Sequence, residues 1–106
     1  MQHRFRGLIA APFTPFNSDC SINLDVMPAY ARFLRENGVS AAFVCGTTGE
    51  GLSLTIEERL AVAEKWMQAT DSRLPVIVHV GHTCLADARR LTAHAARIGA
   101  AAVSAL

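Results

Sequence analysis

The stretch Ala41-Ala-Phe-Val-Cys-Gly-Thr-Thr-Gly-Glu-Gly-Leu-Ser-Leu-Thr-Ile-Glu-Glu58 joins three features that together indicate the fold. The apolar run 41–45 is typical of a buried strand, and the Gly-rich segment 46–51 predicts a loop after it. Thr55 and Glu58 have the spacing of a capping box, in which each side chain binds a free backbone N–H at the start of a helix. The stretch therefore predicts a strand–loop–helix unit.

Working outward, the same unit recurs along the chain. Further apolar runs lie at 7–16, 76–80 and 100–106, and a helix is expected from about Leu24 to Asn37. The apolar face expected on the second helix consists of Ile56, Leu60, Ala63 and Met67, and that on the third helix consists of Leu85, Ala88, Leu91, Ala95 and Ile98. The order βαβαβαβ predicts an α/β fold with a parallel sheet and right-handed crossovers.

Two architectures have this order of elements. In a doubly wound sheet, helices cover both faces, and 106 residues come close to a whole domain. In a (β/α)8 barrel, which takes about 250 residues, the chain supplies roughly the first half. The half-barrel leaves the inner face of the sheet and two strand edges open to water. Composition alone does not choose between the two.

Composition and charge exclude several classes of protein. Of the 106 residues 51% are hydrophobic and 18% are charged, and a net charge of +1 gives no basic stripe for nucleic acid. No apolar run reaches the ~18 residues of a membrane span, and residues 1–6 lack the apolar core of a signal peptide. Cys20, Cys45 and Cys84 form no CxxC pair, which argues against a disulfide scaffold or a zinc site. We therefore expect a reducing, cytoplasmic setting.

The segment Gly46-Thr-Thr-Gly-Glu50 carries the chemistry that the sequence offers. It follows a buried strand, and sites in parallel α/β folds lie at the carboxyl ends of strands. Glycines allow close approach of the backbone to a ligand, and two threonine hydroxyls add donors, which suits a carboxylate or a phosphate. Without a lysine the loop is no P-loop, and it lacks the GxGxxG pattern. The alternative is a Gly-rich turn that binds no ligand.

Three segments together resemble the N-acetylneuraminate lyases, which belong to the dihydrodipicolinate synthase superfamily of class I aldolases. They are GLIAAPFTPF at 7–16, GTTGEGLSLT at 46–55 followed by EER, and VIVHVGH at 76–82. The resemblance runs from Gly7 to Leu106. Residues 79–81 and 102–105 favour the lyase branch of the superfamily.

The resemblance implies a (β/α)8 TIM barrel of which residues 1–106 form the N-terminal half, a single incomplete domain with four strands and three helices. It also implies a homotetramer that cleaves N-acetylneuraminate to pyruvate and N-acetylmannosamine with no metal or organic cofactor. Carried over from the family, Thr47 and Thr48 hold the carboxylate of the pyruvate moiety, and Thr47 also contacts the catalytic tyrosine. The backbone around Gly46 and Gly49 shapes the same pocket.

By the same resemblance, the Schiff-base lysine on the sixth strand and the tyrosine on the fifth lie beyond Leu106. The one lysine present, Lys65, is interpreted as a solvated helix residue, and Tyr30 as a packing residue of the first helix. We therefore expect this chain by itself to bind at most part of a sugar acid or keto acid and to be inactive. No catalytic residue is assigned within it.

Other polar residues have a structural and a functional interpretation. His79 and His82 form an HxxH, but residues three apart at a strand end tend to point to opposite faces, so packing is favoured over metal binding. Cys45 is expected to be a buried small residue rather than a pocket residue. Glu50 is expected to bind loop N–H groups or a basic neighbour and receives no catalytic role.

Two rival functions remain open at the level of sequence. A dihydrodipicolinate synthase has the same scaffold and condenses pyruvate with aspartate semialdehyde. A non-catalytic, truncated half-barrel is the other rival, favoured by the absence of a candidate Schiff-base lysine from this chain. Such a module is expected to form a dimer or an aggregate, because its monomer exposes an apolar sheet face.

Overall fold

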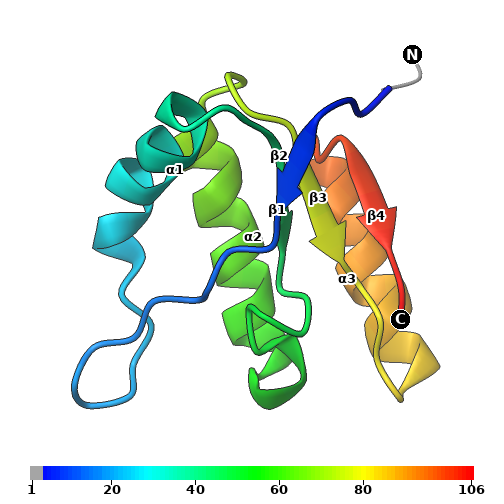
Figure 1. The fold of residues 1–106 in the computed structure, drawn as a ribbon. Coiled ribbons are helices and arrows are strands. Elements are labelled where there is room, and N and C mark those ends of the chain that lie inside the picture. Colours follow the sequence, from blue (N-terminus) through cyan, green and yellow to red (C-terminus); the bar gives the residue numbers. More distant parts are fainter. Residues whose placement is uncertain (1–3) are drawn as a thin grey trace.

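The computed structural model describes residues 4–106 and contains one four-stranded parallel sheet. Its strands are β1 (Leu8–Ala10), β2 (Val39–Val44), β3 (Val76–His79) and β4 (Ala102–Ser104), hydrogen-bonded in the order β1-β2-β3-β4. All three pairings are parallel, and in Figure 1 the arrows of β1, β3 and β4 point the same way. The prediction about a signal peptide rests partly on residues 1–3, which lie outside the described residues.

Helices connect successive strands, as the sequence predicts. They are α1 (Met27–Glu36), α2 (Ile56–Thr70) and α3 (Leu85–Arg97), with 3-10 turns η1 (Leu24–Val26) and η2 (Gly51–Ser53). The capping box at α2 is confirmed: Glu58 N donates to Thr55 Oγ1 at 3.0 Å, and Thr55 N donates to Glu58 Oε1 at 2.8 Å. Within residues 4–106, none of the helices is both long and apolar enough to span a bilayer.

The strand order decides between the two architectures. A doubly wound sheet reverses its strand order so that helices reach both faces, whereas here the order simply follows the chain. Every second residue of β2 and β3, namely Ala42, Val44, Val76 and Val78, points to the same face of the sheet. Side chains of α1, α2 and α3 all pack in one cluster with these residues, so the three helices cover one face. The arrangement is that of part of a (β/α)8 barrel, and the TIM-barrel prediction is confirmed.

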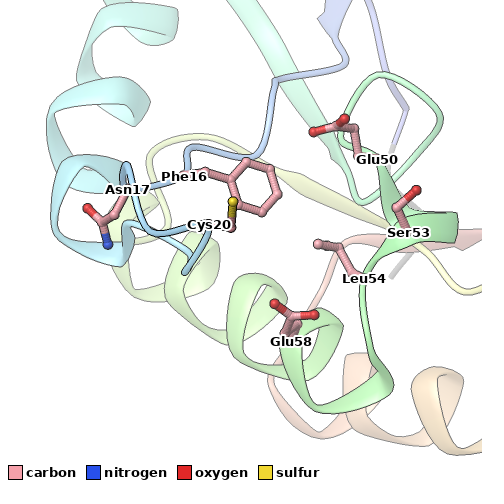
Figure 2. Close-up of a pocket in the computed structure, with 7 residues that line it drawn as sticks. All are labelled: Phe16, Asn17, Cys20, Glu50, Ser53, Leu54 and Glu58. Carbon is pink, nitrogen blue, oxygen red and sulfur yellow. The ribbon is translucent and has the colours of Figure 1, made fainter.

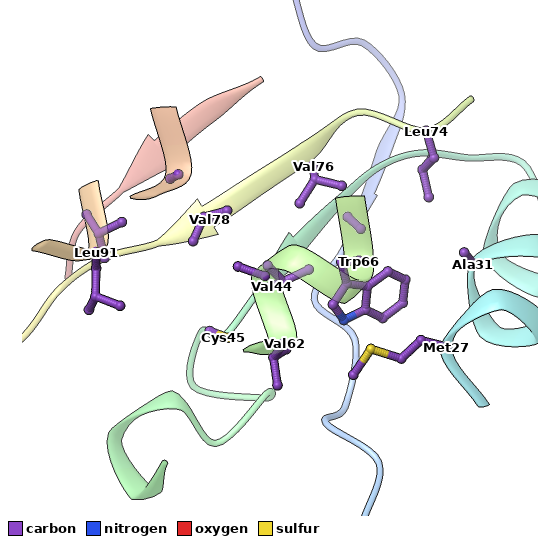
Figure 3. Packing of buried hydrophobic residues seen from close by; sticks show 14 of the residues in the cluster. Met27, Ala31, Val44, Cys45, Val62, Trp66, Leu74, Val76, Val78 and Leu91 are labelled. Atoms are coloured by element: carbon purple, nitrogen blue, oxygen red, sulfur yellow. The ribbon is translucent and has the colours of Figure 1, made fainter. Parts of the chain in front are cut away.

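The hydrophobic core lies between the sheet and this single layer of helices (Figure 3). Trp66 of α2 sits at its centre, and its ring centroid is 5.3 Å from that of Tyr30 on α1. The predicted face of α2 packs on the core, with Ala63 buried and Ile56, Leu60 and Met67 partly buried against it. The buried side of the helix is wider than predicted and also includes Arg59, Val62, Trp66 and Thr70. On α3, Leu85 is 64% exposed and His94 is buried instead.

The opposite face of the sheet carries no helix. The strand register places Phe43 beside Ile77, and alternation along β3 puts His79 on the same face. Ile77 and His79 are nevertheless buried, while Leu8 and Ile9 of the edge strand β1 are 72% and 44% exposed. The face that would line a barrel is thus packed at its centre and open along its edge.

Candidate functional site

The loop after β2 is held in a defined shape by its backbone. Cys45 and Glu50, at its two ends, have left-handed φ values of 60° and 58°. Between them, Glu50 N donates to the carbonyl of Thr47 and Gly51 N donates to the carbonyl of Gly46, both at 3.0 Å. Left-handed conformations at residues other than glycine are uncommon and recur at ligand sites. The loop is therefore a turn at the carboxyl end of β2 whose conformation is fixed by these backbone hydrogen bonds.

The predicted site residues occupy two different environments in this loop. Thr47 and Thr48 are exposed, and their hydroxyls take no part in the loop bonds described above. Gly46 and Gly49 are buried beneath them. A Cβ at Gly49 would lie 3.1 Å from Cys45 N and 3.3 Å from the carbonyl oxygen of Pro12, so a side chain there would push the loop away. The geometry leaves two hydroxyls free to bind a small anion.

Thr14 fixes this loop from a distant part of the sequence. Its hydroxyl donates to the carbonyl of Gly49 at 2.6 Å, and its side chain is buried. Thr14 lies in the segment after β1, so the bond joins the carboxyl ends of β1 and β2. The sequence alone did not predict a role for Thr14. Its partner is 35 residues away, so no pattern of neighbouring residues indicates the contact.

Arg59 is a second residue whose role the sequence did not reveal. It lies in the first turn of α2, is 2% exposed, and donates to the carbonyls of His79 at 2.7 Å and Gly81 at 2.8 Å. Among the ion pairs of residues 4–106 none includes Arg59. A buried guanidinium without a carboxylate partner is unusual, because desolvation of the charge is costly. Arg59 thus places a positive charge at the carboxyl end of β3.

Burial and this charge set the protonation of two neighbours. Burial raises the pKa of the Cys45 thiol to about 11, against a smaller opposite effect of Arg59. Burial lowers the pKa of His79, the charge of Arg59 lowers it further, and the backbone of Ser104 acts in the opposite direction. At neutral pH the thiol is therefore protonated and the imidazole uncharged. The prediction that Cys45 is a buried small residue is confirmed.

An open pocket lies between the segment 16–20 and the residues that follow the loop (Figure 2). It has a volume of about 530 Å³ and is lined by Phe16, Asn17, Cys20, Glu50, Ser53, Leu54 and Glu58. Neither Thr47 nor Thr48 lines it, and its two charged lining residues are both glutamates. Carboxylates repel an anionic ligand. This pocket is therefore unsuited to an anionic ligand.

The remaining candidates have structural roles. His82 Nδ1 accepts a bond from Cys84 N at 2.8 Å and its Nε2 lies 4.0 Å from Asp87, whereas His79 is buried in the sheet. Within residues 4–106 no three His, Cys, Asp or Glu side chains are placed to hold a metal ion.

Tyr30 accepts a bond from Phe13 N at 3.1 Å and packs on Trp66, which confirms its packing role. Lys65 is a half-buried residue of α2.

A parallel sheet with its helices on one face and a polar loop at the carboxyl end of a strand is the arrangement of a (β/α)8-barrel enzyme. The sequence pattern of the dihydrodipicolinate synthetase family matches residues 4–106. The chain belongs to that family. Among curated relatives, N-acetylneuraminate lyase of Xenopus tropicalis is 47% identical over 103 residues, and that of Homo sapiens is 46% identical over 99 residues.

Solved structures agree with this assignment. The chain superposes on Proteus mirabilis N-acetylneuraminate lyase with a TM-score of 0.94 and 43% identity, covering 97% of this chain and 35% of that one. It superposes on dihydrodipicolinate synthase from Aquifex aeolicus with a TM-score of 0.90 and 36% identity, covering 95% and 34%. The curated relatives are matched over 95% and 92% of this chain. The chain spans about a third of the length of the Xenopus tropicalis relative, 34%.

Proposed function

We propose that the full-length protein carrying this chain is a Schiff-base aldolase that cleaves N-acetylneuraminate to pyruvate and N-acetylmannosamine. The observation that carries the proposal is the loop after β2, which presents the hydroxyls of Thr47 and Thr48 on a rigid turn. The similar proteins described above also support the proposal, because several of them are N-acetylneuraminate lyases.

In this mechanism, Thr47 and Thr48 donate hydrogen bonds to the carboxylate of the sugar acid, and the backbone at Gly46 and Gly49 shapes the pocket beneath it. A lysine outside residues 1–106 attacks the keto carbon and releases water to form an imine. The C3–C4 bond then breaks: a base takes the proton of the C4 hydroxyl, C4 becomes the aldehyde carbon of N-acetylmannosamine, and the electron pair of the bond moves toward the protonated imine nitrogen. Protonation of the resulting enamine at C3 and addition of water to the imine release pyruvate and regenerate the lysine. Fixing the carboxylate aligns the breaking bond, which is the part of catalysis that positioning supplies.

The proposal includes the setting of the enzyme. Residues 1–106 would supply the first four strands of a single eight-stranded barrel, with four later strands completing the inner face. The assembled protein would be a homotetramer that acts in sialic acid catabolism without a metal or organic cofactor. Three cysteines outside any disulfide, Cys20, Cys45 and Cys84, favour a cytoplasmic location.

Pyruvate binding by the full-length protein tests the role of the two threonines. Thr47→Val and Thr48→Val each remove one hydroxyl at nearly constant volume. Since a hydrogen bond to a charged group contributes about 1.5–3 kcal/mol, each variant should bind pyruvate about ten- to a hundredfold more weakly in calorimetric titration. Thr92→Val, an exposed hydroxyl bonded to Ala88 on α3, is the control and should bind normally. Unchanged affinity in both site variants contradicts the proposal.

A second candidate is a dihydrodipicolinate synthase. The close superposition on the Aquifex aeolicus synthase favours it, because the same loop could hold pyruvate for condensation instead of cleavage. Assaying the full-length protein for cleavage of N-acetylneuraminate and for condensation of pyruvate with aspartate semialdehyde separates the two. We expect cleavage to be the faster reaction.

A further inference from the structure

The loop after β2 has a backbone conformation that is unfavourable by itself. Cys45 and Glu50 both have left-handed φ values, which crowd the Cβ of any residue other than glycine against the backbone. The loop's own hydrogen bonds oppose this strain, but they join residues 46–53 only to one another. A contact from another segment therefore adds a restraint that these bonds lack.

Thr14 supplies that contact from the segment after β1. Its hydroxyl donates to the carbonyl oxygen of Gly49 at 2.6 Å, and its side chain is only 6% exposed. Among the hydrogen bonds of residues 4–106, it is the one that joins residues 46–50 to a segment distant in sequence. A buried bond is stronger than an exposed one, because water does not compete for it and the local dielectric is low.

The segment that carries this hydroxyl is itself held in place. The residue before Thr14, Phe13, donates its N–H to the hydroxyl of Tyr30 on α1 at 3.1 Å, and the Tyr30 side chain packs against the core. Pro12 is buried, and its carbonyl oxygen lies 3.3 Å from the position of a Cβ at Gly49. Residues 12–14 therefore form a fixed support against which the loop is held.

The bond from Thr14 acts on the part of the loop that determines where the threonines lie. The carbonyl that it holds belongs to the peptide group between Gly49 and Glu50, which adjoins the left-handed φ of Glu50. Rotation of this peptide group would relieve the strain at Glu50 and would move Gly49 and the adjacent Thr48. The bond opposes that rotation.

We propose that Thr14 is a positioning residue of this site, whose hydroxyl keeps the loop in the conformation in which Thr47 and Thr48 bind the carboxylate of a keto acid. The inference rests on the proposed function, because the keto acid is the ligand of that function. Thr14 does not touch the ligand. It raises the fraction of molecules whose loop is ready to bind, and the apparent dissociation constant is the intrinsic one divided by that fraction.

Calorimetric titration of the full-length protein with pyruvate tests the inference. Thr14→Val removes the hydroxyl at nearly constant volume and leaves the buried carbonyl of Gly49 without its donor. Loss of such a bond from a strained loop should weaken pyruvate binding about five- to tenfold. Thr14→Ser keeps the hydroxyl donor and should bind pyruvate within about twofold of the wild type.

Thr70→Val is the matched control. Thr70 is also a buried threonine, 1% exposed, and its hydroxyl donates to the carbonyl of Met67 at 3.2 Å, but it lies at the end of α2. The variant should lower the melting temperature about as much as Thr14→Val and leave pyruvate affinity unchanged. Amide hydrogen exchange at Glu50 and Gly51, whose N–H groups are bonded within the loop, should become faster in Thr14→Val alone.

The outcomes separate this inference from the proposed function. If Thr47→Val weakens binding while Thr14→Val does not, the inference alone is overturned. An equal loss of affinity in Thr14→Val and Thr14→Ser also overturns it, because the hydroxyl is then not the group that acts. An equal loss in Thr70→Val overturns it too, because the effect is then one of overall stability. If the wild type binds no pyruvate, the proposed function fails and the inference fails with it.

Discussion

Cys45 shows how a single buried residue couples the candidate loop to pH. Burial raises the pKa of its thiol from 9.0 to about 11, so as pH rises the unfolded chain releases this proton before the folded protein does. Stability that is fully present below pH 9 is therefore lost as the pH rises toward 11, by about 2 kcal/mol as an order of magnitude. The shift arises because Cys45 is nearly inaccessible to water.

This loss is measured as the difference in free energy of unfolding between the wild type and Cys45→Ala, at steps from pH 8 to pH 11. The cavity left by alanine adds an offset that does not change with pH, so only the slope of the difference matters. The wild type should lose stability relative to the variant above pH 9. Cys20→Ala, which removes an exposed thiol outside the loop, is measured in parallel as the matched substitution. A flat difference for Cys45→Ala would show that the thiol titrates normally.

Helix α2 carries the element-scale prediction, because its start is defined by a reciprocal capping box between Thr55 and Glu58. Thr55→Ala removes the acceptor of the Glu58 N–H and should weaken the first turn by about 1 kcal/mol. Amide hydrogen exchange in that turn should then become about fivefold faster. Thr55→Ser should keep the wild-type rate, and Thr92→Ala on α3 should not affect the α2 peptide. Unchanged exchange in Thr55→Ala contradicts the capping role.

The same helix shows where sequence reasoning succeeds and where it fails. The capping box is a local pattern, so its position could be predicted from residues 55–58. The full extent of the buried face could not be predicted, since it includes Arg59 and Thr70, polar residues that an apolar stripe leaves out. Arg59 is tolerated there because two carbonyls at and just after the end of β3, 20 and 22 residues away in sequence, accept hydrogen bonds from its guanidinium. Contacts of this range exist only once the strands are assembled.

The candidate site, too, could be predicted from the sequence only where local patterns define it. The loop at 46–50 and its place after a buried strand follow from the order of apolar runs and glycines. The clamp from Thr14 to Gly49, and the packing of His79 on Phe43, depend on the register of neighbouring strands. A single sequence does not specify that register. The sequence therefore locates the candidate loop but not the residues that support it.

At the scale of the whole molecule, the sheet is covered by helices on one face alone. Its edge strand β1 exposes Leu8 and Ile9, and Val103 on β4 is 45% exposed. In a barrel the edge strands pair with further strands, and inward side chains meet in layers at the centre. The proposed activity belongs to that complete barrel, because the role proposed for the threonines is only to bind the carboxylate.

The formation of a covalent pyruvate adduct tests this account most directly. The full-length protein is incubated with pyruvate and borohydride, which reduces an imine to a stable amine, and the modified lysine is located by peptide mass spectrometry. We predict one reduced pyruvate per chain, on a lysine outside residues 1–106, and less adduct in Thr47→Val and Thr48→Val at limiting pyruvate. The absence of any adduct, or an adduct on Lys65, would contradict the account.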